Sequence, residues 1–398
     1  MEAPRTKNRA AVLFCLCCAT FCYGSVYAWS AFSGELATYK GWDYGQVTVA
    51  YSMELMVVAV MGIVGGALLQ KFGARKMIRV AGVMWGLGWI LTGLSQNIFM
   101  LYLVFGIFTG CASAFGYNNS VVTAVAWYPD KKGFASGMAV GVCGMASLFI
   151  APLANYLLTK FNVVMAFCMI GGLFLVISLA TSWYIDSPPP VETQRDPATA
   201  AAIEGKNWQE MLKDPRAYLL WAVIAGASVS GLMITGHASR IGQEVAGISS
   251  AQAALLVGIM AAANFVGRLL LGSLSDKVGR HQIVIGCMVA CALDMLFLSR
   301  VTGFFGFTVA IMIAGMCFGG VLATFSAISS DTFGAKYNGI NYSIIFTGYG
   351  IAAIIGPSIA SSIKNSTGSY SMAFVFAAVF SIAAAILCFV VKKMTPKK

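Results

Sequence analysis

Arg268 is a permanent positive charge in an otherwise apolar stretch, NFVGRLLLGSLSDKVGR (264–280). On a membrane helix it would lie eight residues before Asp276, about 12 Å from the polar end of that helix. Burying a lone guanidinium there costs about 3 kcal/mol or more, so the side chain should face a wet cavity and have an anionic partner. A guanidinium holds a carboxylate through two parallel hydrogen bonds, and Asn264, one helical turn away, can donate another. The pair predicts a carboxylate-binding site; the alternatives are a structural ion pair and a polar network that holds the halves of the chain together.

Two acidic residues also lie within apolar stretches, but depth argues against either as the partner of Arg268. Glu54 lies sixteen residues before Gln70, about 24 Å along its helix, and Asp294 lies thirteen residues after His281, about 20 Å along its helix. A substrate carboxylate is therefore the preferred partner. Glu54 could instead carry a proton, because an apolar site favours the neutral form of a carboxyl group.

Five further side chains are candidates for a cavity or a gate. Asn118 lies at a depth comparable to that of Arg268 and is preferred over its neighbour Asn119, although interhelical hydrogen bonding is an equal alternative. Phe346 and Tyr349 lie one turn apart and could form an aromatic wall, unless Phe346 is ordinary core. Tyr27, close to Trp29, either lines the cavity or belongs to an interfacial aromatic belt. His237 could be an outer gate or a titratable group, although a lone histidine near an interface is more often structural.

The composition indicates that helices in a lipid bilayer position these residues. Of 398 residues, 59% are hydrophobic and 10% are charged, and the mean hydropathy is +0.79. Apolar stretches long enough to cross about 30 Å of hydrocarbon recur along the chain. Twelve are predicted, at 10–33, 47–69, 79–97, 99–124, 134–158, 162–184, 217–238, 251–274, 282–299, 303–328, 339–361 and 371–391. The eleven cysteines all lie in these stretches, which excludes a disulfide framework and favours packing roles.

The net charge of +11 is explained by the predicted membrane topology and not by a surface that binds nucleic acid. If the N-terminus is cytoplasmic, inner segments hold twenty of the 26 Lys and Arg residues, as the positive-inside rule requires. We therefore expect an all-α integral protein of the plasma (inner) membrane with both termini in the cytoplasm. We expect it to work as a monomer.

The chain divides into two similar halves. The polar stretch 186–216 is predicted to be a cytoplasmic linker between six-helix bundles at 1–185 and 217–398, and its NWQEMLKD segment could form a short surface helix. The segments GALLQKFGARK and GSLSDKVGRHQ begin 206 positions apart, at Gly66 and Gly272, while Pro152 and Pro357 lie 205 apart. Six-plus-six repeats around a central cavity are typical of transporters.

The second of these segments resembles the loop motif of the major facilitator superfamily. Its pattern consists of Gly272, Asp276, Lys277, Gly279 and Arg280, and a weaker copy consists of Gly66, Lys71, Gly73, Arg75 and Lys76, with Gln70 where the motif has Asp. Gly272 permits close helix packing and Gly279 a tight turn, while Asp276 with Arg280 can form a charge latch that changes between inward and outward states. Gln70 removes that charge from the first copy.

A narrower resemblance lies in GSVYAWSAF (24–32), GYNNSVVTAVAWYPDKKGFASG (116–137), GRLLLGSLSDKVGR (267–280) and SDTFGAKYNGINY (330–342). These segments resemble the oxalate:formate antiporter family and its monocarboxylate transporter relatives. The resemblance implies that Arg268 binds the substrate carboxylate, as the corresponding arginine of the eighth span does in monocarboxylate transporters. Some relatives have an acid for proton coupling near this arginine, whereas Asn264 cannot carry a proton.

The number of cations in the predicted cavity bears on the substrate. A dicarboxylate needs two, and the oxalate transporter has its second in the eleventh span, but residues 337–363 contain no Lys or Arg. We therefore expect a small monocarboxylate such as formate, acetate, lactate or pyruvate, with a proton as a possible co-substrate. The alternatives are an oxalate:formate-type exchanger, a proton-driven drug exporter, and a membrane receptor or enzyme. The sequence carries no catalytic constellation, phosphate-binding loop or ATPase motif, so we expect no enzyme activity, metal or cofactor.

Overall fold

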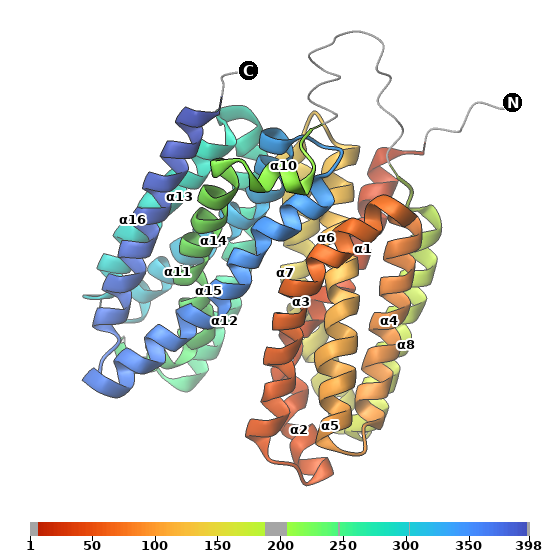
Figure 1. The fold of residues 1–398 in the computed structure, drawn as a ribbon. Coiled ribbons are helices and arrows are strands. Elements are labelled where there is room, and N and C mark those ends of the chain that lie inside the picture. Colours follow the sequence, from red (N-terminus) through yellow and green to blue (C-terminus); the bar gives the residue numbers. More distant parts are fainter. Residues whose placement is uncertain (1–6, 188–204, 246, 302, 396–398) are drawn as a thin grey trace, which may run out of the picture. The chain divides into compact units, whose positions relative to one another are not determined.

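The computed structural model describes residues 7–187, 205–245, 247–301 and 303–395, and these form an almost entirely helical chain (Figure 1). Twelve helices in this part of the chain are long and apolar enough to cross a membrane. This number confirms the twelve spans predicted from the sequence. Pro152 and Pro357, the matched prolines of the two halves, each lie inside a long helix.

The helices of the first half follow one another with short connections. They are α1 (Arg9–Gly24), η1 (Ser25–Ala28), α2 (Ser30–Lys40), α3 (Tyr44–Phe72), α4 (Ala74–Leu94), α5 (Ile98–Leu101), η2 (Tyr102–Thr109), α6 (Gly110–Trp127), α7 (Lys132–Lys160) and α8 (Val163–Tyr184). The first apolar stretch is not one continuous α-helix, because η1 is a 3-10 turn in which the Ser25 hydroxyl donates to the Cys22 main-chain oxygen at 2.6 Å. Immediately before this turn, Gly24 lies against the backbone of Cys143, with no room for a side chain.

The second half begins with a short helix that confirms the interpretation of NWQEMLKD. Its helices are α10 (Trp208–Leu212), α11 (Pro215–Val245), α12 (Ser250–Val278), α13 (Arg280–Leu298), α14 (Phe304–Phe333), α15 (Asn338–Thr367) and α16 (Ser371–Met394). Asn207 and Glu210 form a reciprocal capping box at the start of α10. Gly73 between α3 and α4, and Gly279 between α12 and α13, have φ values of 77° and 109°, so each half has a glycine at its tight turn.

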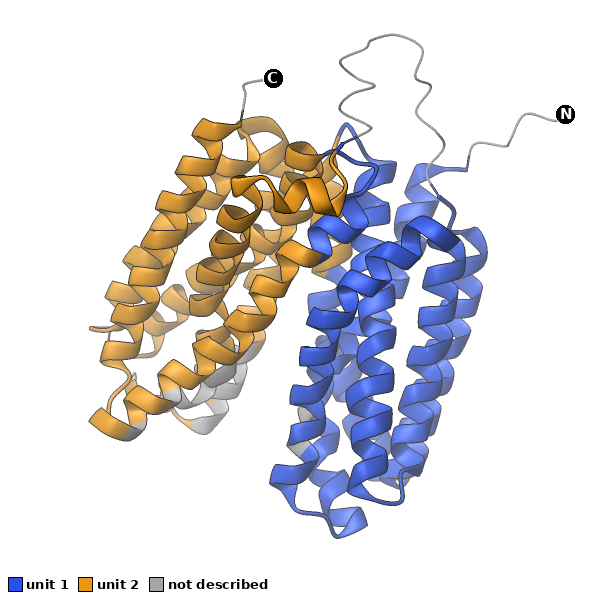
Figure 2. Cartoon of the chain, viewed as in Figure 1, with its two compact units in different colours: residues 1–130, 142–205, 334–343 blue, residues 131–141, 206–333, 344–398 orange. Residues whose placement is uncertain are grey.

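The chain forms two compact units (Figure 2). Unit 1 contains Met1–Asp130, Val142–Gly205 and Gly334–Ser343, and unit 2 contains Lys131–Gly141, Lys206–Phe333 and Ile344–Lys398. The beginning of α7 therefore belongs to unit 2, and the beginning of α15 belongs to unit 1. The bundle boundaries at 185/186 and 216/217 remain predictions, and residues 188–204 of the predicted linker lie outside the described residues.

Each unit has a core suited to helices in an apolar solvent. In unit 1, Trp29 stacks on Phe105 with ring centroids 3.8 Å apart, and Trp89 packs against Phe105 and Phe167. In unit 2, the glycines of α14 allow α12 to approach so closely that a side chain at Gly315 would meet the Met260 main-chain oxygen. Such backbone approach through small residues is the usual way for membrane helices to associate.

Candidate functional site

Arg268 is buried on α12, with 6% of its surface exposed. Its Nη1 donates a hydrogen bond to the main-chain oxygen of Val140 in α7, and its Nε is buried without a partner. Among the residues that the structure describes, no carboxylate forms an ion pair with it. A buried charge normally requires an opposite charge beside it. The Arg268 guanidinium therefore lacks a negatively charged partner among the described residues.

Glycines on two neighbouring helices bring the backbone close to Arg268. A side chain at Gly137 of α7 would collide with the main-chain oxygen of Arg268, and one at Gly319 of α14 would meet the Asn264 carbonyl and the aliphatic part of Arg268. The Asn264 amide donates to the Gly315 main-chain oxygen at 3.1 Å. Asn264 thus fastens α12 to α14 with one of its two N–H groups, which leaves the other as a possible donor to a ligand.

The predicted aromatic pair lies in the same unit as Arg268. Phe346 and Tyr349 of α15 stack with centroids 4.8 Å apart and an interplanar angle of 11°, and Tyr349 is nearly parallel to Phe318 at 6.5 Å. Phe318 directly precedes Gly319, the residue of α14 that packs on Arg268. Four predicted binding residues, Asn264, Arg268, Phe346 and Tyr349, therefore belong to unit 2, and their role in binding stays a prediction.

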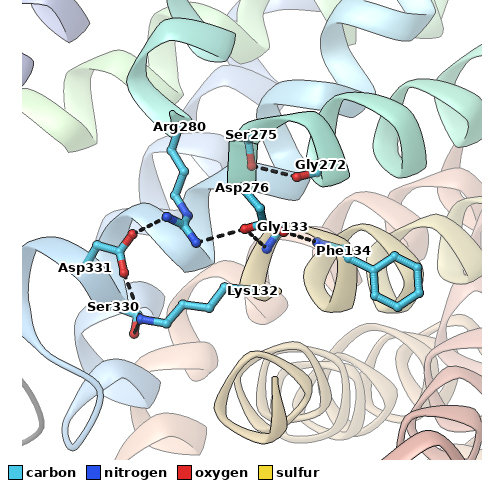
Figure 3. A network of polar contacts seen from close by, with 9 residues as sticks. All are labelled: Lys132, Gly133, Phe134, Gly272, Ser275, Asp276, Arg280, Ser330 and Asp331. Carbon is cyan, nitrogen blue, oxygen red and sulfur yellow. Dashed lines mark hydrogen bonds and ion pairs between the residues drawn. The ribbon is translucent and has the colours of Figure 1, made fainter. Parts of the chain in front are cut away.

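At the end of α12, Asp276 caps the beginning of α7 (Figure 3). Its two carboxylate oxygens accept hydrogen bonds from the main-chain nitrogens of Gly133 and Phe134, at 2.9 and 3.1 Å. A carboxylate at this place satisfies donors that have no partner within the helix, and it interacts favourably with the positive end of the helix dipole. The same carboxylate pairs with Arg280, whose Nη2 is 3.0 Å from the Asp276 oxygen.

A second acid completes this group of charges. Asp331 of α14 pairs with Arg280 at 2.5 Å and with Lys132 at 2.7 Å, and Lys132 also donates to the Ser330 hydroxyl. We name the set of Lys132, Gly133, Phe134, Asp276, Arg280, Ser330 and Asp331 the Asp276 network. It fixes the first turn of α7 to α12 and α14 through both side-chain and main-chain bonds.

The weaker copy of the loop motif, in unit 1, is arranged differently. Arg75 pairs with Asp186, which follows α8, at 2.6 Å, and its Nε donates to the Ile185 main-chain oxygen. Gly66 lies against the backbone of Gly339 at the beginning of α15, as Gly272 lies against that of Gly133 at the beginning of α7. The close helix contact is thus present in both copies. In the second copy, Asp276 also caps the partner helix. At position 70 the first copy has Gln, as the sequence shows.

Asn118 and Tyr27 lie in unit 1. Asn118 and Asn119 are both buried; the Asn119 amide donates to the Gly65 main-chain oxygen, and the Asn118 oxygen has no partner in the described structure. Tyr27 is 42% exposed on η1, whereas Trp29 is buried. Trp29 is therefore part of the core, and the roles predicted for Asn118 and Tyr27 stay predictions.

The three candidate titratable groups belong to three different helices. Glu54 is buried on α3 in unit 1, and Asp294 is buried on α13 in unit 2; neither makes a hydrogen bond of normal geometry within the described residues. Asp294, which is in the same unit as Arg268, forms no ion pair with it among the described residues. His237 belongs to α11, but its side chain lies outside the described residues.

The start of unit 2 carries a further charged group. The Asp214 carboxylate receives hydrogen bonds from Arg216 at 2.6 Å and from Lys206 at 2.7 Å, and it is 7% exposed. The bonds from Arg216 hold the pKa of Asp214 well below its usual value. The main-chain nitrogen of Lys206 donates to the Phe333 oxygen, two residues after Asp331. This charged group therefore attaches the segment before α11 to the end of α14.

Comparison with known proteins decides the family. The model of the Major Facilitator Superfamily matches residues 11–357 and, in a second match, 242–398. The chain belongs to the major facilitator superfamily. The fold agrees, because the crystal structure of the superfamily transporter FucP in the outward conformation matches with a TM-score of 0.74 at 14% identity, over 95% of this chain and 98% of that one.

Several known proteins are similar along most of the chain. The MFS-type transporter YhjX of Escherichia coli is 31% identical over 84% of this chain and 83% of its own length. The oxalate:formate antiporter of Oxalobacter formigenes is 26% identical over 93% of this chain and 88% of its own. Monocarboxylate transporter 12 of Rattus norvegicus is 23% identical over 88% of this chain and 79% of its own length. The superfamily and its fold are those of integral membrane transporters rather than enzymes, and the chain is a member of that class.

Sequence reasoning missed part of the site of this superfamily member. Asp331 and Lys132 lie in segments that carry the family resemblance, yet nothing in the spacing of 132, 276 and 331 indicates that they meet. Val140 could not be recognised at all, because the group it contributes is a main-chain oxygen. The Gly-x-x-x-Gly-x-x-x-Gly spacing of Gly133, Gly137 and Gly141 was the available signal that α7 packs closely on another helix.

Proposed function

We propose that the chain is a secondary active carrier of small monocarboxylate anions, such as lactate, pyruvate, formate or acetate, and that Arg268 binds the carboxylate. The observation that carries this proposal is the buried guanidinium, whose bonding partner within the described part of the chain is a main-chain oxygen and not an acid. A carboxylate ligand would supply both the missing charge and acceptors for two N–H groups. The Asn264 amide and the stacked rings of Phe346 and Tyr349, all in unit 2, are the groups proposed to complete the pocket. Substrate binding by Asn118 and by Tyr27, in unit 1, is a separate proposal from the sequence.

The charge count supports a monocarboxylate over a dicarboxylate. Arg268 is a single cation, and residues 337–363 offer no second one. An oxalate bound beside one guanidinium would keep an unpaired negative charge in a site of low dielectric, which is costly. A relative named oxalate:formate antiporter, at 26% identity, favours exchange of oxalate-type anions as the second candidate.

The Asp276 network is proposed to act as a latch in alternating access. It holds the beginning of α7 against α12, and about two turns further along α7 Arg268 bonds Val140. Release of α7 would break the charge pairs, the helix cap and the Arg268 bond together. We further propose that residues 1–185 and 217–398 form the two six-helix bundles and that the protein lies in the plasma membrane. We also propose that both termini are on the cytoplasmic side, which the inside-positive distribution of Lys and Arg supports.

Uptake into proteoliposomes tests the proposal. Purified protein should take up labelled lactate or formate faster than oxalate, and Arg268→Ala should reduce uptake to the level of empty vesicles. Arg300→Ala, a change of an exposed cation, is the matched control and should transport normally. Normal lactate uptake by Arg268→Ala would contradict the role of Arg268, and oxalate uptake as fast as lactate uptake would favour the second candidate.

A further inference from the structure

Glu54 is an acid in the interior of unit 1 that the proposed carboxylate site does not use. Its side chain is 0% exposed, and neither carboxylate oxygen has a hydrogen-bond partner of normal geometry among the described residues. In the first six membrane spans, it is the one acidic residue of the sequence away from the helix ends. An acid placed so deeply marks a functional site more often than a structural one.

The wall opposite Glu54 is built from an unusual piece of helix. Residues 102–109 form the π-helical segment η2, and such segments occur frequently at functional sites. Gly106 packs on Met53, and Gly110 lies against the main-chain oxygen of Glu54, so η2 and α6 approach α3 at close range on both sides of the acid. A smaller or apolar residue would fit this interface without the cost of burying a carboxyl group.

No charged side chain described in the structure neutralises Glu54. The titratable groups on the elements packed against α3 are Glu35, Tyr39 and Lys40 of α2, Arg75, Lys76 and Arg79 of α4, Tyr102 of η2, Cys111 and Tyr117 of α6, and Tyr342 at the beginning of α15. None of them forms an ion pair with it. Arg75 pairs with Asp186, and Arg79 donates to the Ser182 hydroxyl, so both are engaged at the other end of α3.

We infer that the carboxyl group of Glu54 binds the proton that crosses the membrane with the monocarboxylate. The inference rests on the proposed function and adds the coupling ion to it. The substrate neutralises Arg268, and the proton neutralises Glu54. Because no other side chain among the described residues neutralises either group, loading one ligand alone leaves one buried charge uncompensated, which is costly in the membrane interior. The carrier is therefore expected to reorient with both ligands bound.

The position of Glu54 in the repeat favours Glu54 over Asp294, the other buried acid, as the residue that binds the proton. Glu54 lies on α3 and Arg268 lies on α12, and these are the two helices that carry the matched loop motifs. The glycines of α3 hold the beginning of α15, as those of α12 hold the beginning of α7. Asp294 lies on α13 beside Cys291, and no such contact is observed for α13 in the described residues. Glu54 therefore lies on one of the two helices whose glycines hold the beginning of a partner helix, and Asp294 does not.

Two transport assays on the full-length protein test this inference. Counterflow of labelled lactate at equal pH on both sides needs substrate exchange without net proton movement. Uptake driven by an acidic exterior, with the membrane potential clamped to zero, needs proton coupling, and one pH unit supports about tenfold accumulation in a one-to-one symport. The variants are Glu54→Gln, which keeps the shape but cannot ionise, Glu54→Asp, which keeps the acid, and Asp294→Asn as the matched control.

The expected results separate the two proposals. Glu54→Gln should keep counterflow within about twofold of wild type but lose gradient-driven accumulation, while Glu54→Asp and Asp294→Asn should keep both. Three outcomes would overturn the inference and leave the proposed carboxylate carrier intact. Glu54→Gln could still accumulate lactate in response to the gradient, Asp294→Asn could lose this accumulation instead, or the wild type could show counterflow but no response to the gradient. Loss of both assays in a monodisperse Glu54→Gln protein would make Glu54 structural and also overturn it. A wild type without counterflow would overturn the proposed function and the inference together.

Discussion

Arg268 on α12 bonds to the main-chain oxygen of Val140 on α7. The Val140 oxygen belongs to a helix residue, so it can keep its partner within the helix if the guanidinium leaves. A carboxylate is the stronger acceptor for a guanidinium, because both groups are charged and two bonds can form. An arriving anion would therefore replace Val140 as the partner of Arg268, and substrate binding and the packing of α7 on α12 would share one side chain.

Replacing Arg268 by lysine should reduce transport strongly although the charge is kept. Lysine presents a compact ammonium instead of a planar fork and cannot hold a carboxylate with two parallel bonds. We expect the ratio of maximal rate to half-saturating concentration for lactate to fall by about tenfold to a hundredfold, mostly through weaker binding. Initial rates over a series of lactate concentrations measure this effect, and an unchanged half-saturating concentration would show that the paired geometry is not needed.

The close contact of α7 with α12 predicts a sharp response at Gly137. The added methyl group of Gly137→Ala would run into the main-chain oxygen of Arg268, which cannot move without its helix. Overpacking of this kind costs about 1–3 kcal/mol, so the melting midpoint in detergent should fall. Gly286→Ala on α13 is the control, because a methyl group there meets no atom within 4 Å. The contact would lose its importance if both variants melted like the wild type.

Sequence patterns predicted the number and placement of the spans because hydrophobic length is a direct requirement of the bilayer. The break after Gly24 was not predictable in this way, and neither was the close approach of the Cys143 backbone to Gly24, which comes from another helix. Similarly, the sequence predicted that Asp276 could pair with Arg280 one turn later, which the structure places at 3.0 Å. It could not predict the capping of α7 by Asp276 or the pairing of Lys132 with Asp331, because these contacts join segments more than 140 residues apart.

Asp214 should make the stability of the protein depend on acidic pH. Its bonds to Arg216 keep its pKa in the folded state below the ordinary value of about 3.9. The ionised form is thus favoured by folding, so this contribution is fully present above about pH 4 and is lost as the pH falls toward the folded-state pKa. We expect Asp214→Asn to lower the melting midpoint near neutral pH by a few degrees, and the difference from wild type to shrink at about pH 3. A difference that does not change with pH would contradict this account.

Removal of Asp331 should disturb the Asp276 network more than removal of a neighbouring charge. Asp331→Asn leaves Lys132 without its carboxylate and leaves Arg280 with Asp276 alone, so we expect lactate transport to slow by about threefold to tenfold. Adding Lys132→Gln to this variant should then have little further effect, because the bond is already gone. Lys131→Gln is the control, since Lys131 is exposed and forms no ion pair in the described structure. Strictly additive effects of Asp331→Asn and Lys132→Gln would show that the two residues act separately.

A second cation on α15 should change which anions the carrier accepts. Tyr349 stacks on Phe346 in the same unit as Arg268, so Tyr349→Lys would add a positive charge to this unit without altering Arg268. A dicarboxylate could then have a cation for each of its charges, and we expect the rate of oxalate uptake relative to lactate to rise by about tenfold. Tyr349→Met separates this effect from the loss of the ring, because it is neutral and of similar length. The gain should vanish when Arg268→Ala is added, since one cation would again face two carboxylates. Lactate uptake that persists in Tyr349→Lys without any gain for oxalate would mean that the number of cations does not set the substrate.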